Sequence, residues 1–396
     1  TAIKASYARY VAGQAIAFAN QVNPIGALTA SDTRPWNDLD GNGLPLDANG
    51  NIQFNELTNS ASTPTFGRLT VPTTQYSPDL LRGWGKRGYN NEVTFAAQHQ
   101  LADRISVNGG YYRRTFGNQT ITDDLRYDAS SYDYVCLTAP RDPDLPDGGG
   151  YQVCGIPDLK QSVFALGQPA NSLIRFSKDF GGETNLYQGF DVNLESRFRN
   201  GAFLRGGIAA TSRTFDQCNL LAAGADAVAA GSSEIYPDGS KGCHREYGYR
   251  PDAKFSGSYT LPWDIQLGGT YQFTRGVQTG GAGPRITASW TVAQAVALQQ
   301  LGRNWQSNAA SRTVQLISEG KDYGKHNLNQ LDIKLAKRFT VDKVRLRVDF
   351  DLYNVFNSSW PYTVSTTYSN TAASSYLRPT NVLQNRFFKL GGHISF

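Results

Sequence analysis

The feature that most constrains the fold of this chain is a two-residue alternation of apolar and polar side chains near its C-terminus. From Val344 to Leu352 every even-numbered residue is apolar and every odd-numbered residue is polar, and a similar alternation occupies 331–336 and 388–396. Successive side chains of a β-strand point to opposite faces of its sheet, so each segment has one apolar and one polar face. A shift by one residue would exchange the two faces, so the pattern also fixes the register of each strand.

The same alternation recurs along the chain and predicts about ten strands. Upstream of the C-terminal segments, the predicted strands lie at 1–10, 88–99, 105–116, 184–198, 202–215, 247–261 and 265–273. Very short connections alternate with very long ones, and one short connection contains Asn200-Gly201, a strong signal for a tight hairpin. The long connections are residues 11–85, 118–183, 216–246, 277–327 and 357–385.

This asymmetry of the connections favours an antiparallel transmembrane β-barrel of the bacterial outer membrane over a soluble β-sandwich. A sandwich with one solvated face also alternates apolar and polar residues. Outer-membrane barrels add short periplasmic turns and long extracellular loops, and they turn their apolar side chains toward lipid and their polar ones toward the lumen. We therefore expect an all-β fold whose C-terminus is periplasmic and whose long loops face outward.

Composition agrees with this class and excludes others. The 38 Lys and Arg residues nearly balance the 33 Asp and Glu residues, and no basic block indicates a nucleic-acid partner. No apolar run approaches the ~18–20 residues of a membrane helix. The 40 Gly, 21 Tyr and 20 Phe residues suit strands, turns and aromatic girdles. The chain has no Met and opens within a strand-like run, so we expect it to be a fragment.

The four cysteines form two local pairs, and each pair lies within one predicted loop. Cys136 is near Cys154, and Cys218 is near Cys243. An even number with local pairing predicts two disulfides formed in an oxidising compartment. A structural metal site would need closer, CxxC-type spacing.

Residues 38–43, DLDGNG, copy the start of an EF-hand calcium loop. Asp38, Asp40 and Asn42 stand at ligand positions 1, 3 and 5, and Gly43 stands at position 6. Position 12 falls on Asn49, where an EF-hand has a bidentate Glu, so the ligand set within 38–49 is incomplete. A solvated Asp-Gly and Asn-Gly turn is the alternative interpretation. Calcium is the single cofactor that the sequence suggests.

The histidines do not indicate a metal enzyme, because none forms an HExxH motif or a close pair. A ten-stranded barrel could still be an outer-membrane protease with a His–acid pair on its loops. His326 lies near Asp322, and His244 lies near Glu246, so these are the pairs to consider. A surface adhesin, whose loops only bind partners, is a third hypothesis.

Several segments together resemble the large TonB-dependent outer-membrane receptors, most closely the Oar-like type with a carboxypeptidase-regulatory-like domain near its N-terminus. The resemblance covers nearly the whole chain, and the order and spacing of its motifs are more specific than any one of them. The matching segments are TAIKASYARYV at 1–11, RGWGKRGYNN at 82–91, GYYRRTFGN at 110–118, DLPDGGGY at 144–151, NQLDIKLAK at 329–337 and DLYNVFN at 351–357.

The resemblance implies a barrel of about 22 strands with a plugged lumen, of which residues 1–396 would be the C-terminal part. The plug, the segment that engages the TonB complex and the first barrel strands would lie outside this chain. Phe396 looks like the signal read by the barrel-assembly machinery. Such a receptor is not an enzyme; it resides among outer-membrane lipids and takes up or exports a bulky substrate that its loops capture. Charges of the lumen face would pair with one another or with the plug: Asp332, Lys334, Arg345, Arg347, Asp349 and Asp351.

Overall fold

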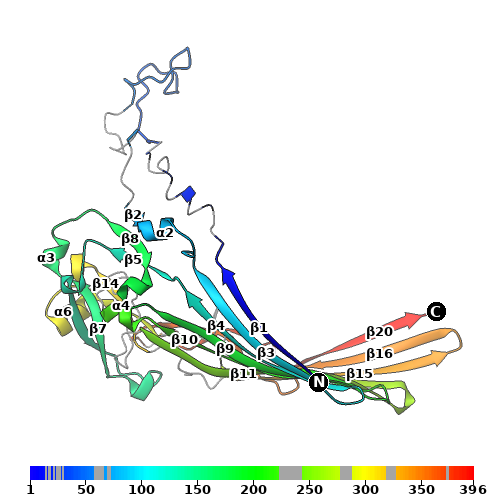
Figure 1. Ribbon diagram of the computed structural model, residues 1–396. Coiled ribbons are helices and arrows are strands. Elements are labelled where there is room, and N and C mark those ends of the chain that lie inside the picture. The colour runs from blue at the N-terminus through cyan, green and yellow to red at the C-terminus, as the bar shows by residue number, and fades with distance from the viewer. Residues whose placement is uncertain are drawn as a thin grey trace.

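A computed structural model shows that a ten-stranded antiparallel sheet dominates the chain (Figure 1). The structure describes residues 1–13, 16, 19–20, 23, 28, 31–57, 67–68, 73–222, 243–276, 288–317, 327–371 and 374–396. In order across the sheet, the strands are β1 (Ala2–Val11), β3 (Tyr89–Ala102), β4 (Ile105–Gly117), β9 (Thr184–Arg197), β10 (Phe203–Asp216), β11 (His244–Leu261), β12 (Ile265–Thr274), β15 (Leu328–Val341), β16 (Val344–Tyr353) and β20 (Phe387–Ser395).

Two predicted strand ends are wrong by a few residues. The break expected after residue 99 is absent, and β3 continues to Ala102, because the reversal takes place at Asp103-Arg104, where Arg104 has φ 69°. The second error concerns the start of β11, which begins at His244 instead of residue 247. Its pairing with β10 extends to Asp216, the last residue of β10. Periodicity marks the middle of a strand well, but the cross-strand partner decides where it ends.

Short connections join the strands at one end of the sheet and long connections join them at the other end, as predicted. The short connections are 103–104, 198–202, the single turn of 3₁₀-helix η5 (Pro262–Asp264), and 342–343. Asp342 adopts φ 55°, the left-handed conformation that tight two-residue reversals require. Every long connection leaves from the opposite ends of the same strands.

One face of the sheet is apolar from the first strand to the last, and it is exposed. Cross-strand partners share a face, so the register places Phe95, Tyr111 and Phe190 side by side on it. Further along, Leu335, Phe350 and Leu390 form a second such row. These side chains remain between 36% and 67% exposed, so nothing in the described chain covers this face.

The sheet is open. Strand β1 pairs with β3 alone, and β20 pairs with β16 alone, so these two strands are its edges within the described residues. In Figure 1 the arrowheads of β1 and β20 lie well apart and point in different directions. The ten strands therefore do not close on themselves through β1 and β20.

The long connections are not irregular loops, because they contain further strands and short helices. No helix among the described residues is long and apolar enough to cross a membrane. Small sheets combine β2 (Thr74–Tyr76), β8 (Ser172–Phe176) and β5 (Thr120–Asp124); β6 (Tyr132–Thr138) and β7 (Gln152–Leu159); β14 (Ser311–Gln315), β13 (Ser289–Ala293) and β18 (Thr367–Tyr368); and β17 (Pro361–Val364) and β19 (Pro379–Val382).

Among the described residues, the helices of these connections are all short. They are α2 (Pro78–Leu81), η2 (Ala129–Ser131), η3 (Pro146–Gly148), α3 (Gln161–Phe164), η4 (Ser177–Phe180), α4 (Cys218–Ala222), α6 (Gln294–Leu301) and η6 (Gln306–Asn308). Together with the small sheets they gather at one end of the long strands, on the left of Figure 1.

Candidate functional site

The long connections fold against one another and share a hydrophobic core. Its buried side chains come from three separate connections: for example Val153 and Ile156 from β7, Val292 and Trp305 from the β13–η6 segment, and Tyr368 from β18. We call these three segments, residues 118–183, 288–317 and 354–386, the loop assembly. Because their apolar side chains bury each other, the loops form one folded unit at one end of the long strands.

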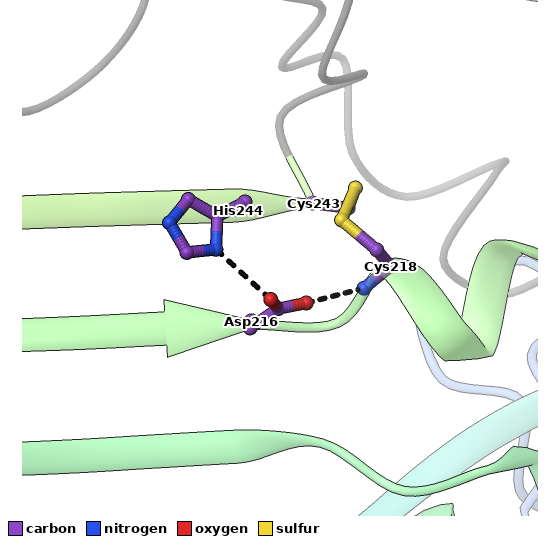
Figure 2. The surroundings of a disulfide bond; sticks show 4 residues. All are labelled: Asp216, Cys218, Cys243 and His244. Atoms are coloured by element: carbon purple, nitrogen blue, oxygen red, sulfur yellow. Dashed lines mark hydrogen bonds and ion pairs between the residues drawn. A yellow bond between two sulfur atoms is a disulfide. The ribbon is translucent and has the colours of Figure 1, made fainter.

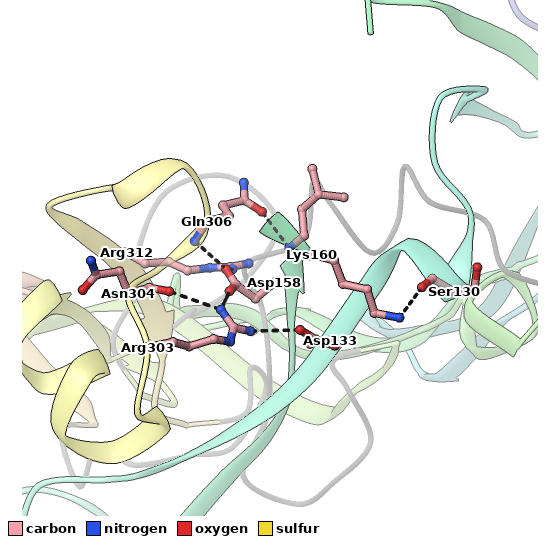
Figure 3. Close-up of polar contacts among 9 residues, drawn as sticks. Ser130, Asp133, Asp158, Lys160, Arg303, Asn304, Gln306 and Arg312 are labelled. Carbon is pink, nitrogen blue, oxygen red and sulfur yellow. Dashed lines mark hydrogen bonds and ion pairs between the residues drawn. The ribbon is translucent and has the colours of Figure 1, made fainter. Parts of the chain in front are cut away.

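A buried carboxylate joins two segments of the loop assembly (Figure 3). The side chain of Asp158 is fully buried. Its Oδ1 accepts hydrogen bonds from Arg312 Nη1 at 3.1 Å and from the backbone N of Gln306 at 3.3 Å. Its Oδ2 accepts from Arg303, which also forms an ion pair with Asp133 at 3.3 Å. Both oxygens are thus occupied, and the carboxylate is suited to holding the assembly together and not to binding a ligand.

The same network contains a second link and a desolvated cation. The side-chain oxygen of Gln306 accepts a hydrogen bond from the backbone N of Leu159 at 2.8 Å. Burial lowers the pKa of the Arg312 guanidinium, and the charge of Asp158 opposes that effect. The network was not predicted from the sequence. Arg303 and Arg312 lie 145 and 154 residues from Asp158 in the sequence, and no local motif marks them as its partners.

Both disulfides have the pairing that the spacing of the cysteines predicts. One links Cys136 of β6 to Cys154 of β7, and the other links Cys218 to Cys243. Figure 2 shows the second beside an Asp–His pair, in which Asp216 Oδ2 lies 2.9 Å from His244 Nδ1. The other oxygen of Asp216 accepts a hydrogen bond from the backbone N of Cys218 at 2.9 Å. The disulfide and the Asp216–His244 contact thus fasten the open end of the β10–β11 hairpin.

The prediction of Glu246 as the acidic partner of His244 is therefore wrong. The neighbour considered from the sequence was Glu246, whereas the structure pairs His244 with Asp216 on the facing strand. Residues two apart on one strand share a face but do not reach each other as closely as a direct cross-strand neighbour does. His326 and Asp322, the other pair, lie outside the described residues.

The polar face of the sheet carries ion pairs, as expected for its mixed charges. Lys334 Nζ lies 3.2 Å from Asp349 and 3.1 Å from Asp351, and Arg347 Nη2 lies 2.9 Å from Asp349. These side chains come from β15 and β16, whose register places Lys334 opposite Asp351. Mutual neutralisation leaves no strong field of one sign along this part of the face.

A cavity of about 570 Å³ lies where β1, β3 and β4 reach the loop side. Tyr10, Asn90 and Phe116 are cross-strand neighbours and line it from the polar face of the sheet. Lys86 adds a cation at its rim, and Ile174 of β8 closes it from the loops. The side-chain oxygen of Asn90 is buried without a hydrogen-bond partner. An unused acceptor between two aromatic rings suits a ligand that has a hydrogen-bond donor.

The calcium-loop motif forms a compact turn, shown in blue at the top of Figure 1. Asp38 accepts hydrogen bonds from the backbone N of Gly41 at 2.7 Å and of Gly43 at 2.9 Å, while Asp40 Oδ1 accepts from the backbone N of Asn42 at 3.0 Å. A hydrogen bond from the Gln53 side chain, followed by one from the Asn42 backbone, lowers the pKa of Asp40. Asn49 belongs to a separate turn around Asp47, to which its backbone N donates at 2.8 Å.

Comparison with known proteins finds distant structural likenesses and no relative in sequence. No family model matches the chain, and no curated protein matches it. The outer-membrane transporter YddB from Escherichia coli has 12% identity and a TM-score of 0.26, covering 78% of this chain and 32% of its own. The ferric-catecholate import receptor Fiu from E. coli K12 in its closed form has 13% identity and a TM-score of 0.26, covering 73% of this chain and 36% of its own.

The open form of Fiu has 10% identity and a TM-score of 0.19, covering 85% of this chain and 45% of its own. This chain thus spans less than half the length of the solved structures with which it aligns. At these TM-scores the likeness by itself establishes neither a shared family nor a shared function.

Proposed function

We propose that the chain is part of a TonB-dependent outer-membrane receptor, in which the ten-stranded sheet belongs to a closed and plugged barrel of about 22 strands. The observation that carries this proposal is an open sheet with one apolar, exposed face and one ion-paired face. In water the exposed apolar face would drive aggregation, so this face needs a lipid environment. In lipid each unpaired backbone N–H and C=O group along the edges of β1 and β20 would cost several kcal/mol, so both edges need further strands to pair with.

The arrangement of the connections supports an orientation. We propose that the short turns and Phe396, which is fully exposed, face the periplasm, where Phe396 serves as the signal for the barrel-assembly machinery. The loop assembly and both disulfides then face outward, where oxidation is permitted. The folded loops present a fixed surface that captures an extracellular ligand, and the cavity beside Asn90 is a candidate for the first contact.

The proposed activity is transport of a bulky substrate, by uptake or export, with energy from the TonB complex. The resemblance to the Oar-like receptors motivates this part of the proposal, and no catalysis is expected. A ten-stranded barrel protease would require β1 to pair with β20 and close the barrel. These two strands do not pair, which argues against the protease alternative. An adhesin, which binds through the same loops and moves nothing, is the remaining competitor.

Topology is tested by labelling single introduced cysteines in intact bacteria that produce the complete protein. All four cysteines of this chain are in disulfides, so each introduced thiol would be the sole reactive one within residues 1–396. A membrane-impermeant maleimide should label Ala129→Cys in the loop assembly. It should label Lys343→Cys, in the β15–β16 turn, only after the outer membrane is opened. Labelling of Lys343→Cys in intact cells would overturn the orientation.

Transport is separated from adhesion by epistasis with TonB. If the protein is a TonB-dependent transporter, disrupting its gene should add nothing to the growth defect of a strain that already lacks TonB. The comparison is made on a panel of iron chelates, oligosaccharides and peptides as nutrients. If the protein is an adhesin, disrupting its gene would give a phenotype that is independent of TonB. That phenotype would add to the growth defect of the strain that lacks TonB.

A further inference from the structure

The calcium-loop motif lacks a glutamate at its twelfth position, and the fold brings Glu56 next to the motif from further along the chain. The antiparallel bridges Trp36–Leu57 and Leu46–Ile52 fold the segment 36–57 back on itself. The backbone N of Asn37 also donates to the backbone O of Glu56 at 2.9 Å. This folding returns Glu56 to the motif, although it is seven residues beyond Asn49 in sequence (56 − 49).

Glu56 brings a third carboxylate to the two of the motif. One carboxylate oxygen each of Asp38, Asp40 and Glu56 lies within 4.8 Å of the others. Three like charges at this separation repel one another, and among the described residues no Lys or Arg forms an ion pair with any of them. A cation at the centre would convert this repulsion into attraction.

The state of Glu56 is the independent observation that points to a ligand. The residue is 1% exposed. Its Oε1 accepts hydrogen bonds from the backbone N of Leu39 at 2.9 Å and of Asp40 at 3.4 Å. Its Oε2 is buried and has no hydrogen-bond partner. A buried carboxylate oxygen without a donor is costly, so this oxygen calls for a partner that the chain itself does not supply.

We infer that Asp38, Asp40 and Glu56 bind one calcium ion, with Glu56 in the role of the EF-hand glutamate. Calcium accepts six to eight oxygen ligands at variable angles, including waters, so a partly exposed site with three carboxylates suits it better than it suits Mg²⁺. Each carboxylate has about four lone-pair positions. Asp38 accepts three backbone hydrogen bonds, and Asp40 accepts one from the backbone and two from side chains, so one position stays free on each. Unlike Asp158, which is fully buried between two arginines, both aspartates are exposed and have no cationic partner among the described residues. The bound ion would fasten the segment 36–57, and this inference does not depend on the transport proposal.

The test is calorimetric titration of the purified complete protein with CaCl₂ after treatment with EDTA. The parent should bind Ca²⁺, and Glu56→Gln, which keeps the shape and removes the charge, should weaken one site by about tenfold or more. Asp47→Asn is the matched control, because Asp47 is a half-buried aspartate of the same segment that lies outside the carboxylate cluster and whose Oδ1 accepts backbone hydrogen bonds in its own turn. It should leave the affinity and the stoichiometry unchanged.

A second variant guards against misfolding, because Glu56 is buried. Asp38 is exposed, so Asp38→Asn should lower the affinity without disturbing the packing of the segment. Calcium should also protect residues 36–57 of the parent from proteolysis, and EDTA should remove that protection. The inference is overturned if the parent binds no Ca²⁺, or if both variants bind it as the parent does. Equal affinity for Mg²⁺ would overturn the choice of calcium.

Discussion

At the scale of single residues, the loop assembly depends on charges that burial has taken out of water. Asp158 is fully buried and is compensated by two guanidinium groups, those of Arg303 and Arg312. The arginines are themselves partly exposed, which reduces the cost of desolvating them. A buried ion of this kind adds little net stability while its partners are present, but removing one partner leaves the others uncompensated.

Replacing Asp158 should therefore destabilise the loop assembly strongly. For Asp158→Ala we expect the free energy of unfolding of the assembly to fall by about 3–5 kcal/mol. The measurement is urea unfolding followed by the fluorescence of the buried Trp290 and Trp305. The control is Asp144→Ala, an exposed aspartate of the same connection, which should stay within about 0.5 kcal/mol of the parent. Equal effects of the two variants would show that the buried network is not needed.

At the scale of elements, each connection of the loop assembly contains an antiparallel strand pair of its own. Strands β6 and β7 pair in antiparallel fashion, and the Cys136–Cys154 disulfide bridges them at the irregularity between Val135 and Leu137. The hairpin contributes Leu137, Val153 and Ile156 to the shared core. A two-stranded hairpin alone is marginal in water, so the covalent link and the core support it together.

Removing this disulfide should lower the stability of the loop assembly. The bridged residues are 18 apart, for which loop-closure entropy predicts a loss of about 3 kcal/mol in the variant Cys136→Ala/Cys154→Ala. The same tryptophan fluorescence measures it. The variant Cys218→Ala/Cys243→Ala removes a disulfide that lies outside the shared core, so it should leave this transition in place. Peptide mapping without reduction should find only the two local links in the parent, and cross-linked loops would contradict the assignment.

At the scale of the whole molecule, the two faces of the sheet require two different environments. The apolar face is exposed along all ten strands, and the opposite face carries paired charges on β15 and β16. This division matches lipid outside and a filled lumen inside. The buried apolar residues are concentrated in the loop assembly and not in the sheet, as the proposed barrel wall requires, because such a wall turns its apolar side chains to lipid.

An arginine on one face should be far more harmful than an arginine on the other. Val192 lies mid-strand on the apolar face and is 50% exposed, so Val192→Arg should destabilise the assembled protein by about 2–4 kcal/mol. Thr270 lies on the polar face opposite Asp332, so Thr270→Arg should be tolerated. Urea unfolding of the complete protein in phospholipid vesicles measures both. A loss for Thr270→Arg that equals the loss for Val192→Arg would contradict the assignment of the faces.

The features that the sequence determined are the local ones. Alternation of side chains is a property of consecutive residues, so the ten strands, their apolar face and the order of short and long connections could be predicted within a few residues. The disulfides were predictable for the same reason, because each pair is close in sequence. Asp38, Asp40 and Asn42 could be put forward as calcium ligands because the spacing of the motif is local, and that assignment stays a prediction.

Only the tertiary structure decided the features that join distant residues. Nothing near Asp158 in sequence points to Arg303 or Arg312, and nothing in the motif at 38–43 points to Glu56. The loop assembly likewise exists because apolar side chains of three connections bury one another, which no single segment can indicate. Periodicity encodes which face a side chain takes, but packing and desolvation choose its partners, and these choices depend on the whole fold.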